Sequence, residues 1–398
     1  MAMPRWRGLH HFSGGILLVD FTDGSKYQDL SKILVFAACN AMNVDQSTAG
    51  YMLLGLIRKY IECDMYLGLE VQTEDTLQKL DQAIVNFGDA LESFRDLYDN
   101  LRPDKEKAKS WDFPKMHAQK HGVPDIKAKG VIQHMSTRLS EKVHGPIRKW
   151  VVTKIDHLFL CSSAIRHRLD DWAEILKEFE DSKMFVSPST RELFQFDSRY
   201  LGAREKPVSC RSLEARPDEA FKNFRARLLR TLKAIYTGRG SAVVPALDAD
   251  ALSIVECRLV EVDYESVITW RAAKDLLRCS PSFYNEPRYD SIMFHDFENT
   301  TALAQLVFPF VVQLDSGERE PMLLIQPTTE EKRRDMDRDL GLYPYLMKTR
   351  DKCRIIPLIS LIRGAVLYKD ASRTSHYFAV DTLDSDMFIR MKSVFRKE

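Results

Sequence analysis

The residue pattern changes its period near Ser241, and this change constrains the fold more than any other feature of the sequence. Before Ser241, apolar residues recur at helical spacing, as Leu30, Ile33, Leu34 and Ala37 do. After it, the apolar segments are short, rich in β-branched and aromatic residues, and separated by Pro, Gly, Asp or Ser. Helices followed by strands predict an α+β fold.

The N-terminal region is predicted to be helical over most of residues 26–98. Thr73 is placed to cap a helix whose first turn carries two acidic residues. Residues 102–110 form a charged, proline-containing connector without core positions. Helical structure is expected to return over residues 111–127 and, as two helices, over residues 139–179.

One further helix is expected after a linker. Residues 181–217 are rich in Ser, Pro and Arg, which favours a linker or a loosely packed crossing. The apolar residues that follow predict a single buried helix face: Phe221, Phe224, Leu228, Leu232 and Ile235. Gly238 and Gly240 are expected to end this helix.

The C-terminal strands predict a mostly antiparallel sheet or a small barrel. They are expected at residues 254–262, 303–314, 322–326, 355–359, 365–368 and 377–380.

The charge balance gives no general sign of nucleic-acid binding. The chain has 58 basic and 57 acidic residues and a formal net charge of +1. Phosphate binding therefore requires a local basic patch. The predicted helix after the linker offers one, because five cationic residues lie off its apolar stripe: Lys222, Arg225, Arg227, Arg230 and Lys233. They can contact DNA phosphates, or they can form an ordinary solvated helix face.

Cysteine usage and hydropathy limit the compartment. The seven cysteines form no CxxC pair, which argues against a zinc ribbon and a disulfide framework and fits a reducing compartment. No apolar run approaches the roughly 20 residues that span a membrane, so no membrane partner is expected.

Two short segments offer candidate ligands. His117 and His121 are four residues apart, a spacing that puts both on one helix face and suits two metal ligands. The alternative is a pair of histidines in the core or at an interface. Ser140 can cap a short helix whose first turn holds Glu141, where a carboxylate is ordinary capping electrostatics.

Longer stretches carry a family resemblance. In the first half they are residues 4–9, 21–27, 64–70, 111–121 and 141–146 (PRWRGL, FTDGSKY, DMYLGLE, WDFPKMHAQKH and EKVHGP). In the second half they are residues 277–279, 287–290, 337–342, 362–365 and 380–388. In this order the stretches resemble fungal transposases of the Plavaka type, a branch of the CACTA superfamily.

The resemblance implies a DDE-type nucleotidyltransferase with an RNase H-like core and a two-metal mechanism using Mg²⁺ or Mn²⁺. In this family two catalytic Asp precede the segment that stands here at residues 4–9. The chain is therefore expected to lack them, to bind no cofactor and to be inactive alone. Glu141 is the candidate third acid, with Ser140 and Val143 where the family usually has Asn and Met.

The same resemblance divides the chain and suggests its partners. Residues 1–110 correspond to a helical insertion region and residues 111–180 to helices that end a partial RNase H-like core. A linker and basic helix follow at residues 181–240, and a β-rich accessory domain at residues 241–398. DNA and other transposase chains are the implied partners, and the nucleus is the implied location; without the resemblance the expectation is cytoplasmic. The alternative is a domesticated protein whose β-rich domain binds protein or chromatin.

Overall fold

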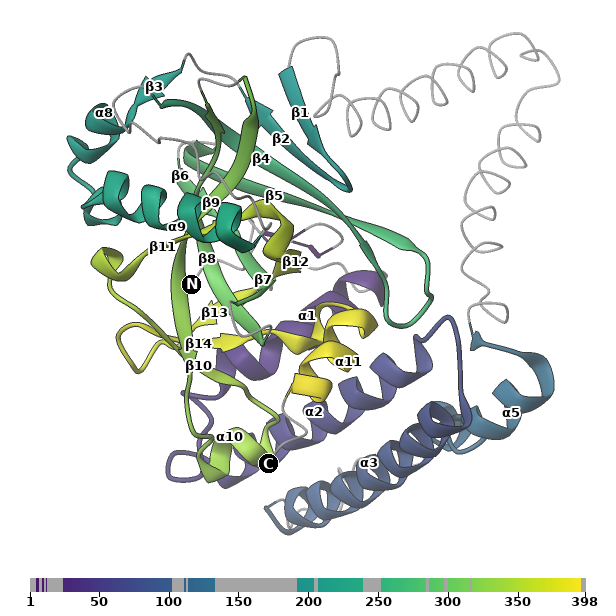
Figure 1. Ribbon diagram of the computed structural model, residues 1–398. Helices are drawn as coiled ribbons and strands as arrows, with labels where there is room; N and C mark the ends of the chain where they lie inside the picture. Colours follow the sequence, from purple (N-terminus) through teal and green to yellow (C-terminus); the bar gives the residue numbers. More distant parts are fainter. Residues whose placement is uncertain are drawn as a thin grey trace, which may run out of the picture.

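The computed structural model describes most of the chain in several ranges. They are residues 5–6, 9–10, 12, 24–101, 111, 114–132, 192–203, 207–238, 252–283, 286–296, 300–314 and 317–394. These residues form an α+β fold in which helices lie beside a large open antiparallel sheet (Figure 1), as predicted. The expected RNase H-like segment, residues 111–180, lies largely outside the described ranges and stays a prediction.

The N-terminal helices follow the predicted pattern closely. Helices α1 (Gly24–Ala38), α2 (Thr48–Leu67) and α3 (Glu74–Leu101) account for residues 26–98. The Thr73 hydroxyl accepts a hydrogen bond from the Thr76 N–H at 3.2 Å, so the predicted cap of α3 is confirmed. The helix predicted at 111–127 is divided into α4 (Pro114–Gln119) and α5 (Gly122–Lys129).

The sheet has fourteen strands within the described ranges. Its main path runs β1-β2-β4-β8-β9-β10-β14-β13, with β3 and β5 also paired to β4, β6 to β5, β7 to β8, β11 to β9 and β12 to β7. Every one of these pairings is antiparallel. The sheet is open, so the small-barrel alternative gains no support.

Four long strands form the centre of this sheet. They are β4 (Ser253–Glu265), β5 (Ala272–Phe283), β8 (Thr301–Gln313) and β9 (Arg319–Glu330). The shorter strands are β3 (Val208–Ser209), β6 (Glu286–Tyr289), β7 (Ser291–His295), β10 (Pro344–Met347), β11 (Arg354–Pro357), β12 (Leu361–Ala365), β13 (Leu367–Lys369) and β14 (His376–Ala379). Among these strands, the sequence pattern missed β3, β5, β6, β7 and β10, and it covered β12 only at its last residue.

The segment expected to be a linker is structured where it is described. Strands β1 (Glu192–Phe196) and β2 (Arg199–Ala203) form a hairpin whose two-residue turn is Asp197 and Ser198. Asp197 adopts φ 51°, a left-handed conformation that Asp tolerates and two-residue hairpins require. Strand β2 then pairs with β4, which joins the hairpin to the main sheet. Helix α8 (Cys210–Glu214) follows.

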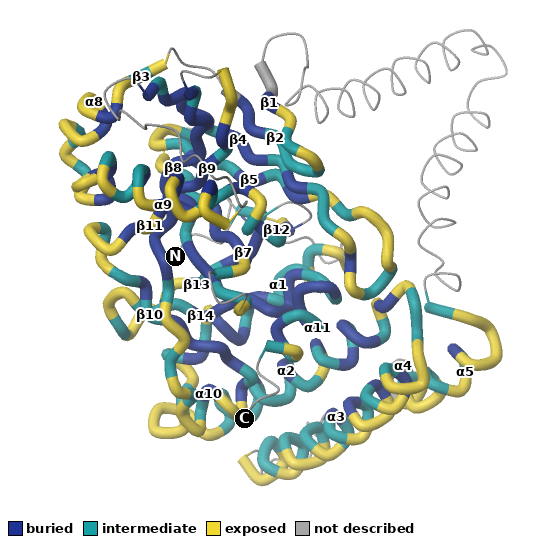
Figure 2. The backbone as a smooth tube through the Cα atoms, viewed as in Figure 1, coloured by how far each residue is buried: buried dark blue, intermediate teal, exposed yellow. Residues whose placement is uncertain are grey.

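Helices from the start of the chain share a core with strands from its end. Ile33 and Phe36 of α1 are buried against Phe378 and Val380, at the end of β14. Helix α11 (Ser385–Val394) contributes Phe388 to a second core with α2 and α3. The dark-blue buried backbone in Figure 2 runs through both sets of elements. Helices and sheet therefore stabilise one another.

Several stretches that carry the family resemblance meet at this junction. A Cβ on Gly364 would lie 2.4 Å from the Trp6 ring and 2.5 Å from the Leu277 side chain. Trp6, Leu277 and Gly364 come from three of those stretches, at residues 4–9, 277–279 and 362–365. The absence of a Cβ at Gly364 thus allows the indole to lie against the backbone of β12.

Candidate nucleic-acid interface

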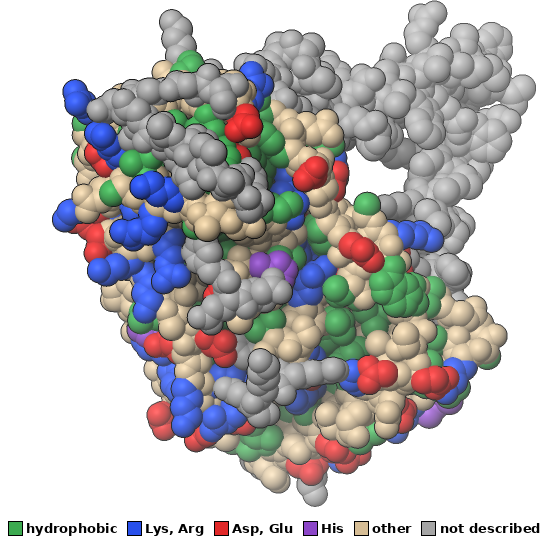
Figure 3. All heavy atoms as spheres, in the orientation of Figure 1, with side chains coloured by type: hydrophobic (Ala, Val, Ile, Leu, Met, Phe, Trp, Pro, Cys, Tyr) green, Lys and Arg blue, Asp and Glu red, His purple; other side chains and the backbone are tan. Residues whose placement is uncertain are grey.

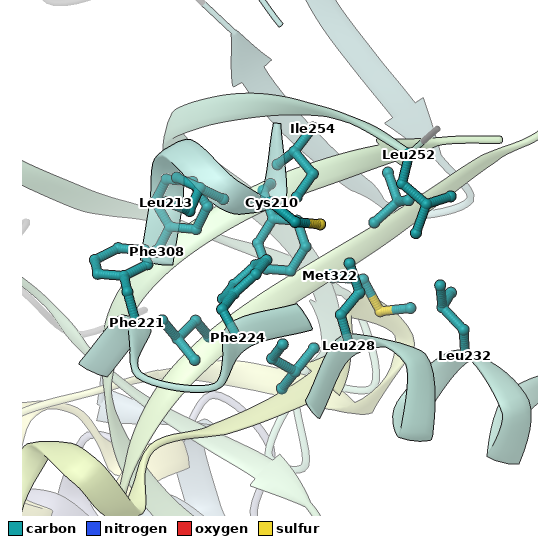
Figure 4. Close-up of a cluster of buried hydrophobic side chains, with 14 of the residues drawn as sticks. Cys210, Leu213, Phe221, Phe224, Leu228, Leu232, Leu252, Ile254, Phe308 and Met322 are labelled. Atoms are coloured by element: carbon teal, nitrogen blue, oxygen red, sulfur yellow. The ribbon is translucent and has the colours of Figure 1, made fainter. Parts of the chain in front are cut away.

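Helix α9 (Phe224–Gly238) is fixed to the sheet by its apolar stripe, as predicted. Phe224, Leu228 and Leu232 have no exposed surface. In Figure 4 these side chains point from the helix towards Phe308 and Met322 of strands β8 and β9. The rings of Phe224 and Phe308 meet edge to face, 6.4 Å apart. The helix therefore has a fixed orientation relative to the sheet.

Exposed cations lie on the opposite face of α9 and, in the case of Lys222, two residues before the helix begins. Lys222, Arg230 and Lys233 are exposed, and none of them forms an ion pair with another described residue. Arg230 and Lys233 are three residues apart, so they are neighbours on the helix surface. Figure 3 shows Lys and Arg side chains gathered over α8 and α9. We call Lys222, Arg230 and Lys233 the α9 cation face.

Arg227 has an internal role although the sequence grouped it with the other cations. Its guanidinium donates hydrogen bonds to the carbonyl oxygens of Cys353, at 2.6 Å, of Lys222, also at 2.6 Å, and of Ala220. Burial lowers the pKa of Arg227, with Cys353 and Glu214 acting in the opposite direction. Arg227 therefore joins α9 to the start of β11 and is not free to contact a phosphate.

Arg225 is half-buried, and its backbone N–H donates to the Glu214 carboxylate at 2.9 Å. Helix α8 and strand β11 pack beside α9 and add exposed Arg211 and Arg354 to the same region. Sequence reasoning missed both arginines because only the tertiary fold brings their elements next to α9. Glu214 and Glu219 are exposed close by, so the positive charge is concentrated along α9 itself.

Three buried or partly buried carboxylates converge on one arginine that the sequence did not single out. Arg363 of β12 lies 2.7 Å from Asp386, 2.8 Å from Asp384 and 3.4 Å from Asp275. The Tyr264 ring covers the guanidinium at 4.8 Å. Burial raises the pKa of Asp275, and the nearby Arg363 opposes this shift. A guanidinium fills the position between these carboxylates, so the cluster is an ion-pair network.

The two candidate histidine ligands lie close together. The Nε2 atoms of His117 and His121 are 3.4 Å apart, and both residues are exposed. They therefore lie outside the core, which leaves an interface or a metal site as the two remaining roles of the pair. No group of three or more potential ligands occurs in the described part of the chain. Glu141, the candidate catalytic acid, lies outside the described residues, so its role stays a prediction.

One aromatic residue is exposed at the tip of the β4–β5 hairpin. Trp270 is 60% exposed and adopts φ 54°. Its backbone N–H donates to the Ser266 oxygen at 2.9 Å, which closes the turn. The Val267 N–H donates to Asp386 at 2.7 Å and ties the tip to α11. Tyr289, another aromatic residue of the β-rich region, instead packs against the sheet core.

The chain matches no protein-family model, no curated protein and no solved structure. Within the described ranges, no helix has both the length and the apolar character needed to cross a membrane.

Proposed function

We propose that this chain is a DNA-binding protein derived from a Plavaka-type transposase and that the α9 cation face contacts the DNA backbone. The observation that carries the proposal is that Lys222, Arg230 and Lys233 are exposed, form no ion pair with another described residue, and lie on or just before a helix whose apolar face is buried against the sheet. Because the helix backbone is already packed, binding requires ordering of the side chains but not of the backbone, and each bound cation releases counterions from the duplex.

The binding is expected to be independent of sequence. Lys and Arg contacts to phosphate position a protein on DNA and carry no base information directly. Two exposed arginines of the neighbouring elements, Arg211 and Arg354, enlarge the cationic surface proposed to face the DNA backbone. The proposal therefore predicts binding to duplexes of unrelated sequence with a strong dependence on salt.

The catalytic part of the proposal depends on the resemblance alone. It assigns residues 111–180 to the end of an RNase H-like core and Glu141 to one of its metal-binding acids. Cleavage by such a core requires Mg²⁺ or Mn²⁺ held by a complete set of acids, of which Glu141 is the candidate in this sequence. We propose nuclear localisation on the same ground.

The test compares two triple variants of the full chain that remove equal charge. One carries Lys222→Gln, Arg230→Gln and Lys233→Gln. The matched control carries Lys120→Gln, Arg271→Gln and Lys369→Gln, which are exposed cations on other elements. Affinity for a fluorescent duplex is measured between about 50 and 200 mM salt, the range in which phosphate contacts change affinity most visibly.

Loss of the α9 cations is expected to reduce the slope of log affinity against log salt by about 3, one for each phosphate contact. The control variant is expected to keep the slope of the original protein. Equal slopes in both variants, or no binding by the original protein at low salt, contradict the proposed interface.

Trp270 supports a second candidate, a protein- or chromatin-interaction role for the β-rich region. A large exposed aromatic side chain on a hairpin held by Asp386 resembles the anchors that dominate protein interfaces. Such an interaction depends weakly on salt, because apolar burial is not screened. Absent DNA binding together with a Trp270-dependent protein interaction favours this second candidate.

A further inference from the structure

We propose that His117 and His121 form a two-histidine chelate for Zn²⁺ or a related divalent transition metal. The proposal is independent of DNA binding. It starts from the distance of 3.4 Å between the two Nε2 atoms. Residues four apart in helical or near-helical backbone lie on the same side of the chain, so the spacing places the two imidazoles next to each other.

The distance fits a tetrahedral ion. Zinc–imidazole bonds are roughly 2.0–2.1 Å long, and a tetrahedral angle of about 109° then separates two ligand nitrogens by ~3.3–3.4 Å. The two ring centroids are 5.2 Å apart with their planes 73° from parallel. The rings are therefore not stacked, and the distance between the two nitrogens already matches the spacing that a shared tetrahedral ion requires.

The backbone holds this arrangement across the boundary between α4 and α5. The Lys120 N–H donates to the His117 carbonyl oxygen at 3.1 Å, and the His121 N–H donates to the Ala118 carbonyl oxygen at 3.1 Å. The Asp125 N–H donates to the His121 carbonyl oxygen at 2.9 Å, which starts α5 on the same turn. Because both histidines are exposed, a metal ion has direct access.

The surroundings specify binding without hydrolysis. In the HExxH arrangement of zinc peptidases the residue after the first histidine is the general base, and here it is Ala118. The nearby Asp125 carboxylate accepts a hydrogen bond from Lys129 at 2.7 Å, so it is already engaged by a cation. Two protein ligands leave two positions of a tetrahedral ion for water or for a ligand from another molecule.

The choice of metal follows from the ligand type. Neutral imidazole suits Zn²⁺, Cu²⁺ and Ni²⁺, whereas Mg²⁺ prefers carboxylate, carbonyl and water oxygens. The site is therefore expected to bind Zn²⁺ and Ni²⁺ and to ignore Mg²⁺. This preference separates it from the Mg²⁺-dependent chemistry implied by the family resemblance.

The experiment is a calorimetric Zn²⁺ titration of the full chain and four variants. His117→Gln and His121→Gln each remove one proposed ligand. His121→Gln combined with Ala118→His keeps the number of histidines but moves one to the neighbouring exposed position, from which it cannot face His117. His295→Gln removes an exposed histidine of β7 as a control.

Each single ligand variant is expected to weaken the site at least about tenfold, the scale on which even outer partners of a bound metal matter. The moved-histidine variant is expected to lose the site as fully, and His295→Gln to keep it. Unchanged stoichiometry and affinity in the moved-histidine variant overturn the proposal and leave the two rings as a hydrogen-bonded pair. Equal loss in His295→Gln also overturns it, because the binding is then unspecific.

Discussion

The Arg58 guanidinium forms a buried, two-point ion pair with the Asp381 carboxylate. The two hydrogen bonds measure 2.9 and 2.6 Å, and the side chains are 1% and 0% exposed. Arg58 belongs to α2, whereas Asp381 begins the short helix η7 (Asp381–Leu383) after β14, 323 residues further along the chain. One ion pair thus joins the helical region to the end of the sheet.

Breaking this pair is expected to destabilise the fold strongly. Arg58→Met leaves the Asp381 carboxylate buried without its partner, and we expect a loss of about 3–5 kcal/mol in the free energy of unfolding. Arg95→Met removes an exposed partner of Asp96 and is expected to change this free energy by less than about 1 kcal/mol. Urea denaturation followed by circular dichroism measures both. Similar losses in the two variants contradict a special role for the buried pair.

Replacement of glycine by alanine is expected to have opposite effects on stability at two positions. Gly341 has φ +62°, and a Cβ there would lie 2.5 Å from Nε of Arg58. Gly341→Ala is therefore expected to cost about 2 kcal/mol or more. Gly88 lies inside α3 with open space around a Cβ, so Gly88→Ala is expected to stabilise by about 0.5–1 kcal/mol. Thermal unfolding of the two variants checks the signs, and a neutral Gly341→Ala refutes the packing argument.

Asp370 is expected to make a pH-dependent contribution to the free energy of unfolding. Although burial alone raises its pKa, hydrogen bonds from Ser372, Arg373 and Asn40 hold the pKa at about 2 instead of 3.8. Because the pKa is lower in the folded state, the stabilisation is present above pH 3.8 and is lost as the pH falls to about 2.

Asp370→Asn is therefore expected to lower stability by about 2 kcal/mol at pH 6 and by progressively less as the pH falls below 3.8. The measurement is the difference in unfolding free energy between variant and original protein at several pH values. A difference that stays constant down to pH 2 is incompatible with the assigned hydrogen bonds.

Arg227 and Arg230 belong to one helix but are expected to respond differently. Arg227→Gln removes the hydrogen bonds to Cys353, Ala220 and Lys222 and is expected to cost about 1–3 kcal/mol of stability. Arg230→Gln is expected to stay within about 0.5 kcal/mol of the original protein and to reduce the salt dependence of DNA binding by about one unit of slope. Denaturation and DNA-binding measurements on both variants separate the two roles. A stable Arg227→Gln variant with weakened DNA binding, together with a destabilised Arg230→Gln variant, contradicts the assignment.

The predicted fold was most accurate where one periodic face determines an element. The stripe of Phe224, Leu228 and Leu232 defined α9, and the capping signal at Thr73 located the start of α3. The β1–β2 hairpin was not predicted because its turn depends on the left-handed conformation of Asp197. Asp tolerates this conformation but does not require it, so the residue gives no clear turn signal. Strand β5 escaped because charged Lys274 and Asp275 interrupt its apolar pattern.

The candidate sites were predictable only in part. The helical spacing of His117 and His121 indicated that they share a face, but their separation of 3.4 Å required coordinates. Five cations were predicted to form one basic surface, and the structure assigns Arg227 to internal hydrogen bonds while adding Arg211 and Arg354. A cation near a helix is exposed or internal depending on what packs beside it, and a neighbour distant in sequence leaves no periodic signal.

The sequence alone determined the α+β class, the helices over residues 26–98 and the buried face of α9, because these follow from hydrophobic periodicity over neighbouring residues. Only the tertiary structure decided that Arg58 pairs with Asp381 and that Arg363 collects three carboxylates. These residues are charged, and sequence analysis predicts a charged residue to be exposed unless its partner is known. Burial of such a group is stable only when the fold brings an opposite charge within hydrogen-bond distance.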